Sequence, residues 1–248
     1  MTNHGRWLGV ALLAAALGGM VCASVSADVI YEDVYYWAPG TGGGIDVYRN
    51  PSDPPLDAYV KIQETVYDDT QGRAHLDLLL NTIGAVHGNP IPVAAFDLYV
   101  YSITNLTYAP PPPSGTGRGV AGYEVDVDAL AMVLGQWSPN AANNAWTGGG
   151  DALGTFWDIN ADQDADLGDG WGIAPTQTFA GFMFAVAAGT PHGLNVPASI
   201  WNWTGEEPGG VEFGEISGFV SGPIPEPATM GLVAMGLSAI FLRRKRSA

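Results

Sequence analysis

The sequence predicts an all-β fold for the chain between its two ends, an antiparallel β-sandwich of the jelly-roll or Ig-like kind. Two observations support this prediction. Short runs rich in β-branched and aromatic residues recur along about 200 residues, with Gly, Pro, Asn and Asp between them. Helical periodicity is scarce over the same region. Several short strands separated by turn-rich loops are typical of a sandwich.

Residues 1–27 have the pattern of a signal peptide. Arg6 precedes an apolar stretch at 7–21, and Val25 and Ala27 stand at positions −3 and −1 of a cleavage point before Asp28. We therefore expect signal peptidase to cut between Ala27 and Asp28. Cys22 is the single cysteine of the chain and is removed with this segment. The exported chain then has no disulfide and depends on a packed core.

Six segments of the region that follows have the composition of strands. In the segment 96–103, alternation places Leu98 and Val100 on one face and Tyr99 and Tyr101 on the other, so both faces can pack. We expect residues 28–222 to form one β-sandwich ectodomain. The six predicted strands are 29–37, 58–66, 76–80, 96–103, 121–127 and 178–187.

Two segments interrupt this strand pattern. Residues 126–136 are expected to form one or two helical turns, with Leu130, Val133 and Leu134 on one face. The prolines at 110–113 favour an extended polyproline conformation, and a glycine-rich stretch follows them. These residues can form a linker, which places a domain boundary at 109–119, or a long loop inside one sandwich. We favour the loop because the strand at 96–103 would otherwise lack its partner.

The chain is strongly acidic. It contains 25 Asp and Glu against nine Lys and Arg. Five of the nine cations lie in the two end segments, so residues 28–227 keep four cations against all 25 acidic residues, a net charge of −21. Such a domain repels phosphate backbones, which argues against nucleic acid as a partner. Cations and neutral polysaccharide fit as partners, and solubility alone is the alternative explanation of the charge.

One acidic loop has the spacing of a calcium site. The candidate metal ligands are Asp158, Asn160, Asp162, Asp164, Asp166 and Asp169. Their oxygens recur at every second residue over most of the loop, and calcium accepts six to eight oxygen ligands. The spacing resembles a dockerin or EF-hand calcium loop, although Gln163 stands where the turn normally needs Gly and 170–172 breaks any following helix. Calcium is the one cofactor we expect, and a solvated acidic loop is the alternative.

Tryptophans indicate a second kind of site. Seven remain after the signal peptide is removed, and exposed indoles stack on sugar rings. In a strand, Trp201 and Trp203 would share one face, and Trp171 flanks a loop rich in glycine. The sequence therefore admits a carbohydrate-binding module for exopolysaccharide. Burial in the core is the competing interpretation, because tryptophan buries a large area.

No catalytic residue is predicted. The sequence lacks a G-x-S-x-G elbow, an H-E-x-x-H pair and a phosphate-binding loop. His75, His87 and His192 stand apart without metal-ligand spacing. An acidic chain supplies pairs of carboxylates by chance, so composition cannot identify a glycosidase. We expect that the protein is not an enzyme.

The last 24 residues contain three parts in a fixed order. They are the triplet Pro225, Glu226 and Pro227, the apolar stretch 228–242, and the basic cluster Arg243, Arg244, Lys245 and Arg246. As a helix the apolar stretch spans about 22 Å, which is short of the roughly 20 residues of a stable membrane span. Over 223–248 this order resembles the PEP-CTERM sorting signal. An ordinary tail anchor is the alternative.

This resemblance implies a route for the protein. PEP-CTERM signals occur on exported proteins of Gram-negative bacteria and are read by exosortase, a membrane protease-transpeptidase. It implies transient insertion into the inner membrane and cleavage at or near 225–227. The final location would be the cell surface or the extracellular matrix, such as that of a biofilm.

The body of the chain carries a second, looser resemblance. Tyr99 and Tyr101 begin a Y-x-Y-x-I-T-N strand, a Trp-Asp strand lies at 156–158, and a G-F-x-F strand lies at 181–184. Over 94–220 this order is similar to β-sandwich ectodomains that PEP-CTERM proteins carry, which implies fold and location but no catalytic residue. We expect a structural or adhesive ectodomain.

Overall fold

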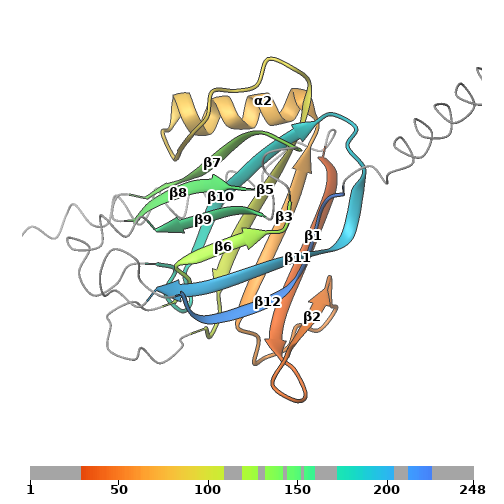
Figure 1. Cartoon of the computed structure of the whole chain (residues 1–248), viewed down its shortest axis with the longest axis vertical. Coiled ribbons are helices and arrows are strands. Elements are labelled where there is room, and N and C mark those ends of the chain that lie inside the picture. The colour runs from red at the N-terminus through yellow and green to blue at the C-terminus, as the bar shows by residue number, and fades with distance from the viewer. Residues whose placement is uncertain are drawn as a thin grey trace, which may run out of the picture.

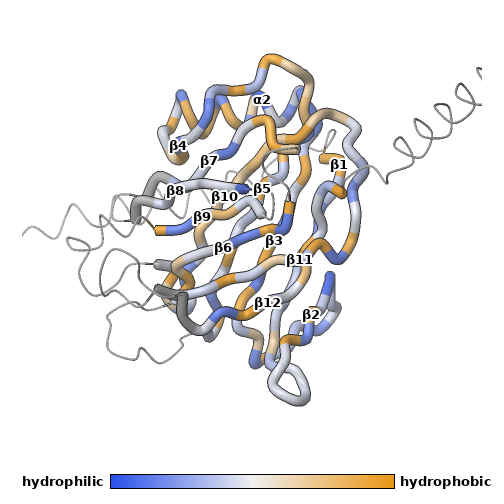
Figure 2. Tube along the Cα trace, in the orientation of Figure 1, coloured by the Kyte–Doolittle hydropathy of each residue, from blue (hydrophilic) through white to orange (hydrophobic). Residues whose placement is uncertain are grey.

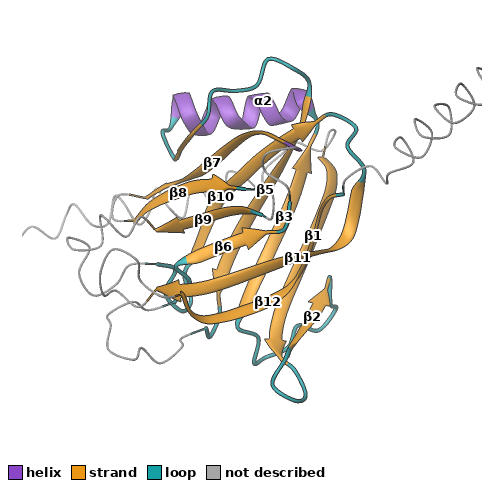
Figure 3. Cartoon of the chain, in the orientation of Figure 1, coloured by secondary structure: helices purple, strands orange, loops and turns teal. Residues whose placement is uncertain are grey.

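Strands dominate the architecture of the chain (Figure 3). The computed structural model describes residues 29–108, 119–127, 132–141, 144–151, 154–159, 172–203 and 212–224. Its strands are β1 (Val29–Pro39), β2 (Ile45–Arg49), β3 (Val60–Tyr67), β4 (Val86–Gly88), β5 (Phe96–Asn105), β6 (Gly122–Val125), β7 (Val133–Ala141), β8 (Asn144–Gly150), β9 (Thr155–Ile159), β10 (Thr178–Ala187), β11 (His192–Trp203) and β12 (Glu212–Pro223). Between β3 and β4 lie the helix α2 (Asp69–Asp77) and the π-helical turn η1 (Leu78–Thr82).

The strands form two antiparallel sheets that share one hydrogen-bonded path. The path runs β12-β11-β6-β9-β8-β7-β10-β5-β3-β1-β2, and β4 pairs with β7. The path passes from one sheet to the other at the β7–β8 hairpin, where Asn140 pairs with Ala145. The strands β6, β8, β9, β11 and β12 therefore cover the sheet that contains β1, β3, β5 and β10 (Figure 1). The prediction of an all-β fold with two antiparallel sheets is confirmed.

Aromatic side chains fill the space between the sheets. Trp157 of β9 stacks on Tyr123 of β6 with ring centroids 5.5 Å apart, and Phe182 and Phe184 of β10 face them from the other sheet. All four side chains are fully buried. Apolar positions recur along the strands of both sheets, as the hydropathy colouring of the trace shows (Figure 2). Large buried rings of this kind contribute much of the apolar area that stabilises a sandwich.

A second, smaller core lies on the outer face of the first sheet. Leu98 of β5 and Met183 of β10 point to this face, while their neighbours Tyr99 and Phe182 point to the core between the sheets. The helix α2 covers the outer face and contributes the fully buried Leu76. Both faces of β5 are therefore packed, as the alternation in its sequence predicts.

The predicted strand at 76–80 is wrong, because these residues belong to the end of α2 and to η1. The Asp68 side chain caps α2 by accepting a hydrogen bond of 2.9 Å from the N–H of Gln71. Gly72 lets the helix approach the sheet so closely that an added Cβ would lie 3.0 Å from the Cβ of Leu98. The cap and this close packing override the β-like appearance of a short run of leucines.

The predicted helical turns at 126–136 are wrong for residues 133–136, whereas Met132 is helical. Val133–Ala141 form strand β7, which pairs with β10 through Gly135 opposite Ala185. Alternation leaves Leu134 exposed and buries Trp137 completely. Long-range pairing with β10 therefore decides the conformation. Leu130 lies outside the described residues.

Several sequence predictions fall outside the described residues. They include the signal peptide with the cleavage point between Ala27 and Asp28, most of the stretch 109–119, and the C-terminal apolar segment. Strands on both sides of 109–118 contribute to the core between the sheets, because the ring of Tyr101 lies 5.5 Å from that of Tyr123. Among the described residues, no helix has the length and apolar character that crossing a membrane requires.

Candidate functional site

Both ends of the folded region lie at the same pole of the molecule (Figure 1). Tyr31, near the start of β1, has its ring 3.9 Å from the ring of His192 at the start of β11. His192 in turn stands opposite Pro223, the last residue of β12. The start of β1 and the end of β12 therefore lie side by side.

Strand β12 leads directly into the Pro-Glu-Pro triplet. Pro223 is buried, and the backbone N–H of Ile224 donates a hydrogen bond of 2.9 Å to the carbonyl oxygen of Pro191. Pro225, the next residue, opens the triplet and lies outside the described residues, as do Glu226, Pro227 and the basic cluster Arg243, Arg244, Lys245 and Arg246. One residue alone separates the end of the sheet from the triplet.

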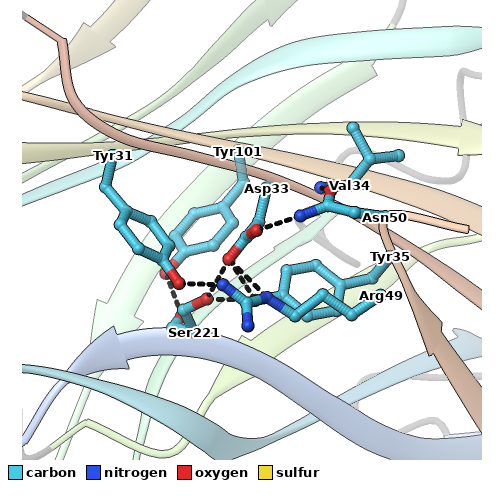
Figure 4. Close-up of polar contacts among 8 residues, drawn as sticks. All are labelled: Tyr31, Asp33, Val34, Tyr35, Arg49, Asn50, Tyr101 and Ser221. Carbon is cyan, nitrogen blue, oxygen red and sulfur yellow. Dashed lines mark hydrogen bonds and ion pairs between the residues drawn. The ribbon is translucent and has the colours of Figure 1, made fainter.

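A buried polar network fastens this last strand to the first sheet (Figure 4). Its centre is Asp33 of β1, whose side chain is 2% exposed. Asp33 Oδ2 accepts hydrogen bonds from Arg49 Nε at 2.8 Å and from Ser221 Oγ of β12 at 2.9 Å. Tyr35 also hydrogen-bonds to Asp33 and to Ser221, and Asn50 donates to Asp33 Oδ1.

Asp33 is held as a carboxylate by these donors. Burial alone would raise its pKa, but hydrogen bonds from Arg49, Tyr31, Ser221 and Asn50 outweigh that effect and lower the pKa to about 2. Ser221 is tied a second time through its backbone, since its carbonyl oxygen accepts from the hydroxyl of Tyr101 at 3.2 Å. Removal of a partner from such a network leaves a buried charge under-compensated.

Two titratable groups beside the network have fewer hydrogen-bond partners than Asp33. Glu64 of β3 is fully buried, and neither carboxyl oxygen has a hydrogen-bond partner among the described residues. Burial raises its pKa well above the usual range, and the proximity of Ser221 offsets part of this rise. Burial also lowers the pKa of His192, whose Nδ1 lies 3.2 Å from the hydroxyl of Tyr99. Burial therefore favours the neutral form of both groups.

This network was not predicted from the sequence, although one signal points to it. The alternation in β1 places Asp33 on the same face as Tyr35 and Trp37, both of which are buried. A carboxylate on an apolar face needs donors. Ser221 gives no such signal, because it lies in a polar, glycine-rich segment that was not predicted to be a strand.

The structure describes one of the six predicted calcium ligands. Asp158 lies in β9 and is half-buried, and its Oδ1 accepts a hydrogen bond of 2.9 Å from Thr147 Oγ1. Burial raises its pKa, and the Thr147 hydrogen bond opposes the rise. Asn160, Asp162, Asp164, Asp166 and Asp169 lie outside the described residues. Within the described ranges, three or more His, Cys, Asp or Glu side chains nowhere gather closely enough to hold a metal ion.

The tryptophans whose side chains the structure describes are buried. Trp201, proposed above for sugar stacking, is 4% exposed and lies over Gly122 of β6. The side chain of its partner Trp203 and the whole of Trp171 lie outside the described part of the chain. The fully buried tryptophans are Trp37, Trp137, Trp146 and Trp157.

Comparison with known proteins identifies the segment that follows the sandwich. Residues 223–246 match the family model of the PEP-CTERM protein-sorting motif. The chain therefore carries the sorting motif of exported proteins that exosortase handles at the membrane, as its sequence predicts. Neither a curated protein nor a solved structure matches the chain.

Proposed function

We propose that this protein is a structural or adhesive component of the bacterial cell surface or extracellular matrix, delivered there by exosortase processing. The observation that carries the proposal is the sorting motif, which continues the last strand of a two-sheet domain without a spacer. A rigid aromatic core and a surface of high negative charge suit a component that must persist outside the cell without disulfides. The proposed role includes no catalytic activity.

Substitution of the sorting triplet tests the delivery. The full chain is expressed in a bacterium that contains exosortase, with Pro225→Ala, Glu226→Ala and Pro227→Ala combined in one variant. We expect the parent chain to lose its C-terminal segment and to reach the surface or matrix, and the variant to stay in the inner membrane at full mass. The double variant Asp53→Ala and Pro54→Ala, in the exposed loop before β3, is the control. Equal processing and location of the triplet variant would contradict the proposal.

We also propose that the acidic loop from Asp158 to Asp169 binds calcium and stiffens the domain. The support is the spacing of its oxygens and the position of Asp158, which Thr147 anchors near the end of β9. Residues 28–224 are melted in EDTA and in millimolar calcium at matched ionic strength. We expect calcium to raise the melting temperature by several degrees, and Asp162→Ala with Asp166→Ala to abolish the rise. Identical melts would exclude a stabilising calcium site.

Carbohydrate binding is the alternative role for the ectodomain. Trp201 cannot stack on a sugar ring while its indole is buried against Gly122. A stacking surface would therefore depend on Trp171 and Trp203. Retention of the domain on the exopolysaccharide of its host, and loss of retention in Trp171→Ala, would favour this role over the structural one.

A further inference from the structure

The sorting motif overlaps the folded domain. The family match begins at Pro223, which is buried in β12 opposite His192. The next residue, Ile224, is bound to Pro191 through its backbone N–H, and its side chain lies against Gly193 of β11. The first residue of the motif is therefore part of the sheet, and the second is hydrogen-bonded beside it.

We propose that pairing with β11 makes the start of the sorting motif inaccessible to its enzyme. Residues 222–224, up to but not including Ser221, must then separate from β11 before processing. This inference rests on the proposed exosortase processing. An enzyme that cuts a chain binds the residues beside the bond in extended form and pairs with their backbone. For cleavage at or near 225–227, the residues on the N-terminal side are Gly222, Pro223 and Ile224. Strand β11 now holds the first two, and Pro191 holds Ile224.

The end of β12 is built to separate as a short unit. Only two register pairs, His192 with Pro223 and Gly193 with Gly222, lie beyond an irregularity in the β11–β12 ladder. At this irregularity Asn195 has a φ of 64°, an uncommon conformation for a residue other than Gly. Gly222 and Pro223 are small, so little apolar area is exposed when they leave the sheet. Opening of such terminal segments requires far less free energy than global unfolding.

Ser221 is where the separation stops. Its hydroxyl is bound to Asp33 and its carbonyl oxygen to Tyr101, and the residue is fully buried. Release of Ser221 would remove one donor from a buried carboxylate, which is far more unfavourable than breaking an exposed backbone pair. Peeling thus frees three residues, or about 10 Å of extended chain. The freed segment can then extend into the enzyme while the two sheets remain packed together.

Two variants test the inference in the full chain, expressed in a bacterium that contains exosortase. The first inserts Gly-Ser-Gly-Ser between Ile224 and Pro225, which supplies free chain without peeling. The second is Gly193→Ala, which lies outside the matched motif and places a methyl group 2.4 Å from the Cγ2 of Ile224, so that Ile224 must shift. Gly44→Ala is the matched control, because an added Cβ there meets no atom within 4 Å.

We expect both variants to accelerate the appearance of the shortened form, measured by pulse-chase and mass. When opening is fast relative to cleavage, the rate follows the open population, so loss of about one hydrogen bond predicts a rise of about five-fold for Gly193→Ala. Gly44→Ala should match the parent. In the chain with the insertion, Gly193→Ala should have no further effect, because the inserted residues already supply the reach.

Three results would overturn the inference. The first is equal rates of processing for the parent chain and both variants. The second is no effect of the insertion alone. The third is faster processing of Gly193→Ala in the chain that carries the insertion. The last result would assign the effect to general destabilisation. Failure of the proposed function gives a different pattern, in which the parent chain is not shortened or the substituted triplet is processed normally.

Discussion

Glu64 is a buried carboxyl inside a protein that is otherwise rich in exposed charge. It is fully buried without a hydrogen-bond partner among the described residues, and its pKa is raised above the usual 4.5. Below pH 4.5 the carboxyl is protonated in both the folded and the unfolded chain. Above it, the unfolded chain loses this proton and the folded one keeps it. Glu64 therefore lowers the free energy of unfolding as pH rises toward its folded pKa.

Glu64→Gln should remove this dependence on pH. We expect the variant to gain stability over the parent as pH rises above 4.5 toward the folded pKa of Glu64, at up to about 1.4 kcal/mol per pH unit. The measurement is urea unfolding of residues 28–224 for both proteins at four pH values. His75 and His192 also titrate, with pKa values that burial lowers, but they are common to both proteins and cancel in the difference. Parallel stability curves would show that Glu64 is ionised in the folded state.

At the scale of elements, the sequence predicts strands well where alternation and burial agree. Strand β5 was predicted because its two faces differ, and the structure packs Tyr101 on one face and Leu98 on the other. The helix α2 and strand β7 were not predicted, because their conformations depend on partners distant in sequence. Leu76 packs with Phe96, and Gly135 pairs with Ala185. Short apolar runs do not reveal such partners.

The cap of α2 gives a prediction at the scale of an element. Asp68→Ala removes the acceptor for the N–H of Gln71 and should lower the free energy of unfolding by about 1 kcal/mol. Asp68 also repels the buried carboxyl of Asp97, so loss of its charge alone would stabilise the fold. Asp68→Asn keeps the acceptor and loses the charge, and it should be at least as stable as the parent. Urea unfolding separates the two effects, and equal losses in both variants would argue against the cap.

At the scale of the whole molecule, the sorting motif could be predicted from the sequence because its order of residues is its signal. The polar network around Asp33 could be predicted only in part. Alternation places Asp33 on a buried face, but Ser221 lies 188 residues further along the chain, and the packing of the two sheets that brings β12 against β1 has no local signature. The overlap of motif and sheet at Pro223 follows only when the fold and the motif are known together.

The net charge of −21 gives a prediction for the whole domain. The described ion pairs include Arg49 with Asp33 and Arg73 with Asp69, and four cations cannot balance the 25 acidic residues of 28–227. Salt screens repulsion between exposed charges more strongly than attraction within a buried pair. The melting temperature of residues 28–224 should therefore rise by several degrees between about 10 mM and about 0.5 M NaCl.

A variant with fewer charges separates this effect from a general effect of salt. The exposed residues Glu32, Asp46, Asp53 and Asp57 carry four of the negative charges. Changing them to Gln or Asn should raise the melting temperature at low salt and make its dependence on NaCl shallower, since less repulsion remains to be screened. If the slopes of the two proteins are equal, or if salt lowers the melting temperature of the parent, long-range repulsion does not limit the stability of this domain. The acidic surface would then act on solubility and on the choice of partners outside the cell.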